Sequence, residues 1–460
     1  MKVCLLIPDG IGIRNYLYSD IIPLLTNETG NTVAVWHSLD TVVLNEAEKL
    51  HPGVHFESHQ FNFYKESPFP RFLRDCVSYA RLKVNALANN NPTILDNWLP
   101  KKYLKGRVSN FLAKQLGRTF TSLENIAAVE SIIREQQRKS PAYKKYRDDL
   151  LKIMPDVLFC THQREPNAGI AMLAAQDLRI KTITAIFSWD NLPKGRLPMR
   201  TDHYLVWSQY MEEELLNYFP DISKESIQIV GTPQFDFYQD PNLLMDRAEF
   251  AAQNGLDSSK RWLCFSGDDS LTSPHDDTYL FDLADQLKGE NDLQILFRPV
   301  PVEAYDRYQS VLDEFPFIKL MVPKWRKGEL WSKYFPYPAD IAVLVNLAYH
   351  SETVVNVGST MALDFAQFNK PGLYVNYEVD VNHPWSIERV YKFQHFRTFA
   401  DLDAVAWINS KGQILPQVRK AIDDPSSLAQ DRSIWKDRIV FQEDHTSAAQ
   451  RIVQFILSLQ

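Results

Sequence analysis

The stretch VVNVGSTMALDFAQFNKPGLYVNY, residues 354–377, predicts a strand, a tight loop, a helix, a turn and a second strand. The run Thr353–Val357 is short and β-branched, as a buried strand should be. Gly358 lets the chain turn sharply, and Ser359 and Thr360 stand where a helix N-cap belongs. A Lys-Pro-Gly turn then ends the helix before the next strand begins. This order is typical of parallel α/β folds.

The helix start in this stretch is a candidate anion site. Free backbone N–H groups and the positive end of the helix dipole favour a negative group there, most often a phosphate. The alternative is an ordinary crossover whose hydroxyl cap binds nothing. The stretch by itself leaves both interpretations open.

Length and composition indicate a globular chain with ample core. A chain of 460 residues suggests two or three domains, and 45% of its residues are apolar while 23% are charged. No apolar run approaches the roughly 20 residues of a membrane span, and the N-terminus MKVCLLIPDG predicts a first strand rather than a signal peptide. The four cysteines are scattered, without zinc spacing, which favours the cytoplasm and no metal site.

The charge is unevenly distributed along the chain. The net charge of −7 argues against a nucleic-acid partner. Residues 100–154 nevertheless hold thirteen Lys and Arg against five Asp and Glu. Such a segment is usually a solvated helical face. The alternative is a face for peripheral contact with an anionic membrane or with a phosphate-bearing acceptor.

The order of predicted elements indicates two domains. Residues 1–60 predict β-α-β-α-β, which is a Rossmann-like start. The strands are expected at 2–7, 32–36 and 54–58, with one helix over 14–25 between the first two and a second from Ser38 to about Leu50. Predicted helices over about 61–154 interrupt this rhythm as an insertion. The rhythm resumes at Pro155. We expect domains at 1–237 and 260–440, a linker at 238–259, and a mostly helical chain from Asp401 onward, within which residues 441–460 form a final helix.

The predicted architecture is therefore α/β, with two Rossmann-like domains facing one another across a cleft. In sheets of this kind, ligands bind where the strands end.

Several separate pieces of the sequence, in this order, carry a resemblance to a known family. They are SWDNLPKGRLP (188–198), HYLVWSQYM (203–211), IQIVGTPQFDFY (227–238), ILFRPVP (295–301), VGSTMALDFAQFNKPGLYVNY (357–377) and RIVFQEDHTSAAQRIVQFI (438–456). From about Pro155 onward the chain resembles the GT-B glycosyltransferases of bacterial surface-polysaccharide biosynthesis. It is similar also to the CDP-glycerol glycerophosphotransferase and capsule transferase families. The resemblance does not extend to residues 60–154.

The resemblance implies a GT-B fold whose C-terminal helix crosses back to the first domain. It implies a nucleotide-activated donor bound by the second domain, with no metal or other cofactor, and an acceptor on the first. Asp364 would hold the ribose hydroxyls or else face solvent from the helix. Arg298 would neutralise phosphate or else form a surface ion pair. Val300 departs from the family, which commonly has a phosphate-contacting His there. The expected donor-binding residues are Ser266, Gly267, Arg298, Gly358, Ser359, Thr360 and Asp364.

An inverting transferase needs a base that takes the proton of the acceptor hydroxyl. The candidates lie on loops after strands of the first domain, and each is alternatively a cap or turn residue. They are Asp9, His162, Glu165 and Asp190. The acidic pair Asp268-Asp269 is interpreted as a solvated loop and not as a metal ligand.

These observations predict a glycosyltransferase. It would move a sugar from a nucleotide sugar to a polysaccharide, a glycolipid or another carbohydrate or lipid-linked hydroxyl acceptor, without a metal. The alternatives are a nucleotide-sugar 2-epimerase, a polyol-phosphate transferase, or a non-catalytic assembly partner that keeps the fold. The expected location is the cytoplasm, or the inner face of the membrane with residues 100–154 as the contact.

Overall fold

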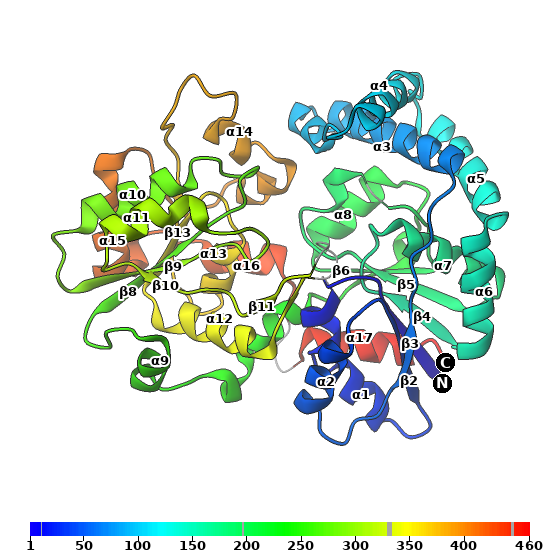
Figure 1. Cartoon of the computed structure of the whole chain (residues 1–460), viewed down its shortest axis with the longest axis horizontal. Coiled ribbons are helices and arrows are strands. Elements are labelled where there is room, and N and C mark those ends of the chain that lie inside the picture. The colour runs from blue at the N-terminus through cyan, green and yellow to red at the C-terminus, as the bar shows by residue number, and fades with distance from the viewer. Residues whose placement is uncertain (11, 196, 329–333, 443–445) are drawn as a thin grey trace. The chain divides into compact units, whose positions relative to one another are not determined.

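The computed structural model describes residues 1–10, 12–195, 197–328, 334–442 and 446–460. The chain forms two compact units, each built around one parallel sheet (Figure 1). The first unit comprises Met1–Pro233, Phe393–His395 and Ile439–Gln460, and the second comprises Gln234–Lys392 and Phe396–Arg438. The α/β class predicted from the sequence is confirmed in both units.

The first unit holds a seven-stranded sheet in the order β3-β2-β1-β4-β5-β6-β7, with every pair parallel. Its central strands β1 and β4 are almost wholly buried, which is why their sequences are continuous apolar runs. The third predicted strand lies slightly later in the chain than expected. The strands are β1 (Lys2–Ile7), β2 (Thr32–His37), β3 (Glu57–Gln60), β4 (Val157–Cys160), β5 (Lys181–Ala185), β6 (His203–Val206) and β7 (Ile227–Ile229).

The helices of this unit follow the predicted alternation with one difference. The region expected as a single helix over 14–25 is a π-helical turn at Ile13–Leu17 followed by a separate helix, α1 (Ile21–Asn27). The last helix of the chain, α17 (Ala448–Leu457), belongs to the first unit and packs against α1, as the red and blue ribbons in Figure 1 show. The predicted return of the C-terminal helix is therefore confirmed. The other helices outside the insertion are α2 (Thr41–Leu50), α7 (Pro166–Asp177) and α8 (Gln209–Tyr218).

The predicted helical insertion is also confirmed. It consists of α3 (Pro68–Ala88), α4 (Leu104–Gly117), α5 (Leu123–Arg138) and α6 (Pro141–Ile153). Helix α3 packs against α4 and α5, and α6 packs against α7. A glycine is needed where α4 meets α3, because a Cβ atom at Gly117 would lie 2.6 Å from the Cys76 carbonyl oxygen.

The second unit holds a parallel six-stranded sheet in the order β10-β9-β8-β13-β14-β15 and a small antiparallel pair, β11 (Trp325–Arg326) with β12 (Phe335–Pro336). The chain after Asp401 is mostly helical, as expected, but it also contributes β15, a parallel strand that was not predicted. The stretch 238–259, expected as a linker, contains α9 (Arg247–Asn254). The sheet strands are β8 (Arg261–Ser266), β9 (Leu293–Arg298), β10 (Lys319–Leu320), β13 (Thr353–Asn356), β14 (Gly372–Val375) and β15 (Ala406–Ile408). The remaining helices are α10 (Asp276–Leu287), α11 (Gln309–Glu314), α12 (Pro338–His350), α13 (Met361–Ala366), α14 (Ile387–Tyr391), α15 (Ile414–Asp423) and α16 (Arg432–Ile439).

The stretch from β13 through α13 to β14 has the predicted strand–loop–helix–strand form. Gly358 makes the turn with a φ of +73°, in the left-handed region that favours glycine. A side chain there would also collide with the protein, because a Cβ atom would lie 2.8 Å from the ring of Phe396.

Among the residues that the structure describes, none of the helices combines the length and the apolar composition of a membrane span.

Candidate functional site

In the first unit the structure brings together two of the four predicted base candidates. Nδ1 of His162 lies 2.5 Å from Oδ2 of Asp9, and both side chains are buried. The contact follows from the sheet, because β1 and β4 are neighbouring parallel strands with Leu6 opposite Cys160. Asp9 follows β1 and His162 follows β4, so both side chains stand at the carboxyl edge of the sheet.

This pairing gives the imidazole a defined chemistry. With its Nδ1–H donated to the Asp9 carboxylate, His162 keeps Nε2 as the ring atom that can take a proton, and the carboxylate stabilises the imidazolium that results. The ring of Phe187 meets the imidazole edge to face, with centroids 5.6 Å apart. A buried, oriented His–Asp pair of this kind can act as a general base.

The other two base candidates hold structural contacts. Glu165 is the N-cap of α7, where its Oε1 accepts the backbone N–H of Asn167 at 3.1 Å. Asp190 forms an ion pair with Lys194. Burial acts to raise the pKa of Asp190, but the charges of Lys194 and His395, with hydrogen bonds from Lys194 and Ser188, together outweigh it and hold that pKa well below its usual range. Asp190 is therefore ionised and a weak base.

In the second unit the predicted donor residues lie at or after the carboxyl ends of three adjacent strands, β9, β8 and β13. Ser266 and Arg298 are direct partners in the β8–β9 register, and Ser266 is buried. The N–H of Gly267 donates to the Arg298 carbonyl oxygen at 2.9 Å. A Cβ atom at Gly267 would lie 3.0 Å from the Tyr308 hydroxyl, so glycine permits this tight crossing.

Arg298 forms an ion pair that is buried rather than exposed. Its Nη2 lies 2.8 Å from Oδ2 of Asp340, and both residues are at most 5% exposed. Asp340 also accepts the indole N–H of Trp325 and the backbone N–H of Lys324, each at 2.7 Å. Sequence reasoning missed Asp340, which lies 42 residues further along the chain. Arg298 was expected either to neutralise phosphate or to form an ion pair, and its contact with Asp340 is an ion pair.

The loop between β13 and α13 is partly occupied by its own contacts. The N–H of Ser359 donates to Oδ1 of Asn356 at 2.9 Å, and its carbonyl oxygen accepts the Tyr374 hydroxyl at 2.9 Å. Thr360 is the exposed N-cap of α13 and makes no side-chain capping bond. This short helix therefore presents Thr360 as the most accessible of the three predicted phosphate-binding residues.

Asp364 lies on the inner side of α13. It is 3% exposed, and its Oδ1 accepts the Tyr238 hydroxyl at 2.8 Å. The partner lies 126 residues earlier in the chain, so no local pattern could have indicated it.

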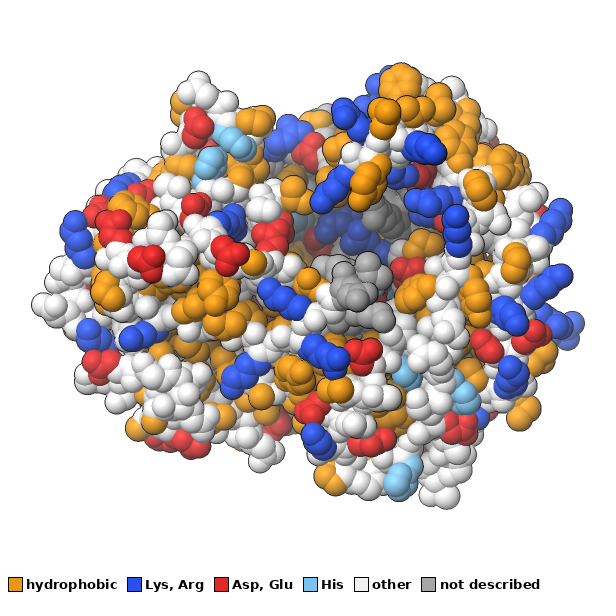
Figure 2. Space-filling model, in the orientation of Figure 1, with side chains coloured by type: hydrophobic (Ala, Val, Ile, Leu, Met, Phe, Trp, Pro, Cys, Tyr) orange, Lys and Arg blue, Asp and Glu red, His pale blue; other side chains and the backbone are white. Residues whose placement is uncertain are grey.

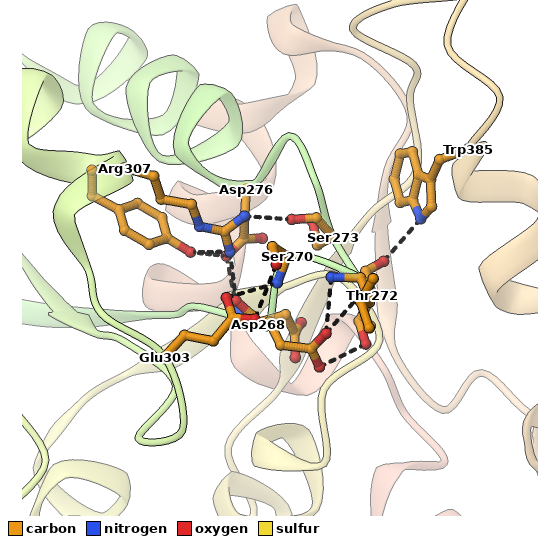
Figure 3. Close-up of polar contacts among 11 residues, drawn as sticks. Asp268, Ser270, Thr272, Ser273, Asp276, Glu303, Arg307 and Trp385 are labelled. Carbon is orange, nitrogen blue, oxygen red and sulfur yellow. Dashed lines mark hydrogen bonds and ion pairs between the residues drawn. The ribbon is translucent and has the colours of Figure 1, made fainter. Parts of the chain in front are cut away.

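Two aspartates of the second unit, Asp268 and Asp276, lie close together, with Asp276 at the start of α10 (Figure 3). Oδ2 of Asp276 accepts the Asp268 backbone N–H at 2.9 Å and the Tyr308 hydroxyl at 2.7 Å. Burial raises the pKa of Asp276 to about 6, and burial with the Asp276 and Asp269 charges raises the pKa of Asp268 well above its usual range. Arg307 closes the cluster by donating to the carbonyl oxygens of Asp268 and Ser273. The interpretation of Asp268 as a solvated turn residue was therefore wrong.

Asp269 does behave as a turn residue. Its Oδ1 accepts the backbone N–H groups of Leu271 and Thr272, each at 3.0 Å. The two adjacent acids thus have different surroundings, which the dipeptide itself could not indicate.

The sequence matches no protein-family model. It also matches no curated protein. Solved structures do share its fold. A UDP co-structure of S. aureus MnaA is 11% identical with a TM-score of 0.53, covering 100% of this chain and 97% of that one. A putative UDP-N-acetylglucosamine 2-epimerase from Listeria monocytogenes is 9% identical with a TM-score of 0.54, covering 100% and 96%. The UDP-GlcNAc 2-epimerase of Methanocaldococcus jannaschii is 12% identical with a TM-score of 0.53, covering both chains fully.

At these identities the likeness establishes the fold, which is GT-B. The two parallel sheets of the described chain, one in each unit, agree with this class. The closer relation to CDP-glycerol glycerophosphotransferases and capsule transferases stays a prediction.

Proposed function

We propose that this chain is an enzyme acting on a nucleotide-activated sugar, with His162 as its general base and Asp9 as the residue that orients it. The observation that carries the proposal is the 2.5 Å contact between Asp9 and His162 at the carboxyl edge of the first sheet. Open parallel sheets bind their ligands at that edge. The GT-B fold supports the class of substrate, because solved proteins of this fold were determined with UDP or UDP-GlcNAc.

The first candidate reaction is epimerisation of the nucleotide sugar at carbon 2. It is supported by the structural neighbours, several of which are named as UDP-GlcNAc 2-epimerases. In this reaction a base removes the proton at carbon 2 while the nucleoside diphosphate leaves carbon 1, so that the electron pair forms a double bond between the two carbons. The diphosphate then adds back to carbon 1 as a proton returns to carbon 2 from the opposite side. A His162 imidazole oriented by Asp9 suits the removal step.

The second candidate is glycosyl transfer, the function predicted from the sequence. In that reaction His162 would take the proton of an acceptor hydroxyl while the nucleoside diphosphate leaves the sugar. The helical insertion supports it, because α4 carries exposed apolar and basic side chains suited to a lipid-linked acceptor. A transfer of polyol phosphate would use the same proton removal.

For the donor we propose the loop after β13. Thr360, with Gly358 and Ser359, would contact the diphosphate, and the neighbouring Ser266 and Gly267 would border the same end of the sheet. A ribose contact by Asp364 would require its hydrogen bond to Tyr238 to be shared or broken. The proposal includes no metal and no cofactor.

Two measurements test this function in turn. Thermal shift with UDP, GDP, CMP, CDP and dTDP compounds identifies the nucleotide, because a ligand that binds the native state raises its stability. The matching nucleotide sugar is then incubated in D₂O without acceptor and followed by proton NMR. An epimerase incorporates deuterium at carbon 2 and produces the epimer, whereas a transferase leaves carbon 2 unlabelled and consumes the donor only when an acceptor is added. A protein that binds none of the nucleotides is the non-catalytic partner, and the proposal fails.

A further inference from the structure

Helix α4 exposes an apolar face. Its side chains Leu104, Val108, Phe111, Leu112 and Leu116 are all exposed, and Leu104 reaches 76%. They recur at intervals of three and four residues, so they form one stripe along the helix. Figure 2 shows hydrophobic side chains gathered with Lys and Arg over α3 and α4. An apolar stripe of this length on a solvated helix needs a partner.

The opposite side of α4 already has its partner within the unit. Asn110, Ala113 and Gly117 are buried, and Gly117 brings the helix against the Cys76 backbone and the Tyr79 ring of α3. Packing within the unit therefore buries the side of α4 that is built from small residues. The apolar stripe on the other side stays exposed in the folded unit.

Cations surround the stripe, and acids are absent from its sequence. Residues 97–123 contain six Lys and Arg and no Asp or Glu. By helical spacing, Lys105 and Arg107 fall at the two edges of the stripe, and Lys102 precedes it. All three are exposed, and none forms an ion pair with a described residue. An amphipathic helix with such a rim is typical of binding at a membrane surface.

A pocket of about 290 Å³ adjoins the stripe. It is lined by three cations, Lys101, Arg107 and Lys114, together with the rings of Trp98 and Phe111. Lys101 also pairs with Asp75, and Lys114 lies over the Tyr79 ring at 5.7 Å, which leaves Arg107 as the cation best able to meet a new anion. Positive charge beside apolar surface suits a phosphate headgroup whose acyl chains lie along the stripe.

We propose that α4 docks this protein on an anionic phospholipid surface, with its apolar stripe in the interface and Lys102, Lys105 and Arg107 among the lipid phosphates. Charge complementarity identifies this partner, because acidic headgroups match the six cations and acyl chains match the stripe. The sequence assigned the basic character to all of 100–154. Within this segment the structure places the apolar stripe on α4, because five large apolar side chains are exposed there, whereas α5 exposes Ile132 and α6 exposes Leu151. The inference holds for either reaction.

The test is co-sedimentation of the full chain with vesicles at low ionic strength. Mixed phosphatidylglycerol and phosphatidylcholine vesicles should retain the wild type, and pure phosphatidylcholine vesicles should retain much less. The double variant Lys102→Glu/Lys105→Glu should lower the partition coefficient at least about tenfold. Phe111→Ser should lower it several-fold while leaving the charge unchanged. Added salt should weaken wild-type binding, since it screens exposed charges.

The matched control is Lys144→Glu/Lys145→Glu on α6, which changes the net charge by the same amount at two exposed sites. We expect it to bind like the wild type. If both double variants lose binding to the same extent, net charge alone explains the effect and the proposal is overturned. The proposal is also overturned if the wild type does not bind anionic vesicles. A wild-type dimer that Phe111→Ser dissociates would show instead that a second copy covers the stripe. All these sites are exposed, so circular dichroism should show every variant folded.

Discussion

Asp276 is a carboxyl group whose protonation the fold controls. It is wholly buried at the start of α10, beside the second carboxyl group of Asp268. Burial raises its pKa to about 6, whereas an unfolded aspartate titrates near 3.9. Between these values the folded state binds more protons than the unfolded state, so this group lowers stability as the pH rises from about 4 to about 6. Above about pH 6 the free energy of unfolding has fallen by the full contribution of this group.

We therefore expect Asp276→Asn to stabilise the protein at alkaline pH. The amide oxygen can still accept from Tyr308 and from the Asp268 N–H, but the side chain can no longer ionise. The free energy of unfolding in urea should rise by roughly 1–3 kcal/mol at pH 8 and should be unchanged near pH 4. The control is Asp277→Asn, which removes the adjacent and less buried charge in the same helical turn. A gain of equal size at both pH values would contradict this explanation.

At the scale of elements, α17 shows how a late segment completes an early unit. Its Ser447 and Gln450 form a reciprocal capping box, and its apolar side chains pack into the first unit. Ile456 in this helix is wholly buried. Ile456→Ala should lower the free energy of unfolding by about 2–4 kcal/mol, because it leaves a cavity.

The exposed Gln454→Ala on the same helix is the matched control and should change stability by less than about 0.5 kcal/mol. Urea unfolding followed by circular dichroism measures both variants. If the two are equally stable, α17 does not contribute to the core of the first unit.

Strong local patterns allowed most elements to be predicted. The β-branched run at Thr353–Val357 and the glycine after it indicated β13 and its turn. The three residues of β15, in contrast, are too few to show a period, and only pairing with β14 makes them a strand. The break between the π-helical turn and α1 lies at Ser19 and Asp20, shortly before Pro23. These residues are break signals that the expectation of one helix over 14–25 did not use.

The site was predictable in its residue types but not in its pairings. Asp9 and His162 could be named because both follow strands, yet their contact spans 153 residues and depends on strand order. The same is true of Asp364 with Tyr238 and of Arg298 with Asp340. A sequence without aligned relatives gives no signal for such long-range partners.

At the scale of the whole molecule, the two units of the GT-B fold carry different parts of the proposed function. The first carries the His–Asp pair at the edge of its sheet, and the second carries the loops proposed for the nucleotide. The insertion adds the α4 face to the first unit. Proton removal and membrane docking therefore depend on different residues, and variants can separate these two steps.

The most direct test of this account is the steady-state rate of His162→Gln with the nucleotide sugar that the wild type consumes. Gln keeps a polar side chain but cannot serve as a base, so kcat should fall by about 10²–10⁴ while nucleotide affinity measured by calorimetry stays within about threefold. Asp9→Asn keeps a hydrogen-bond acceptor but loses the charge, so it should lower kcat and shift the pH–rate profile. A folded His162→Gln protein that turns over the sugar at the wild-type rate would show that the Asp9–His162 pair is a structural contact and not the base.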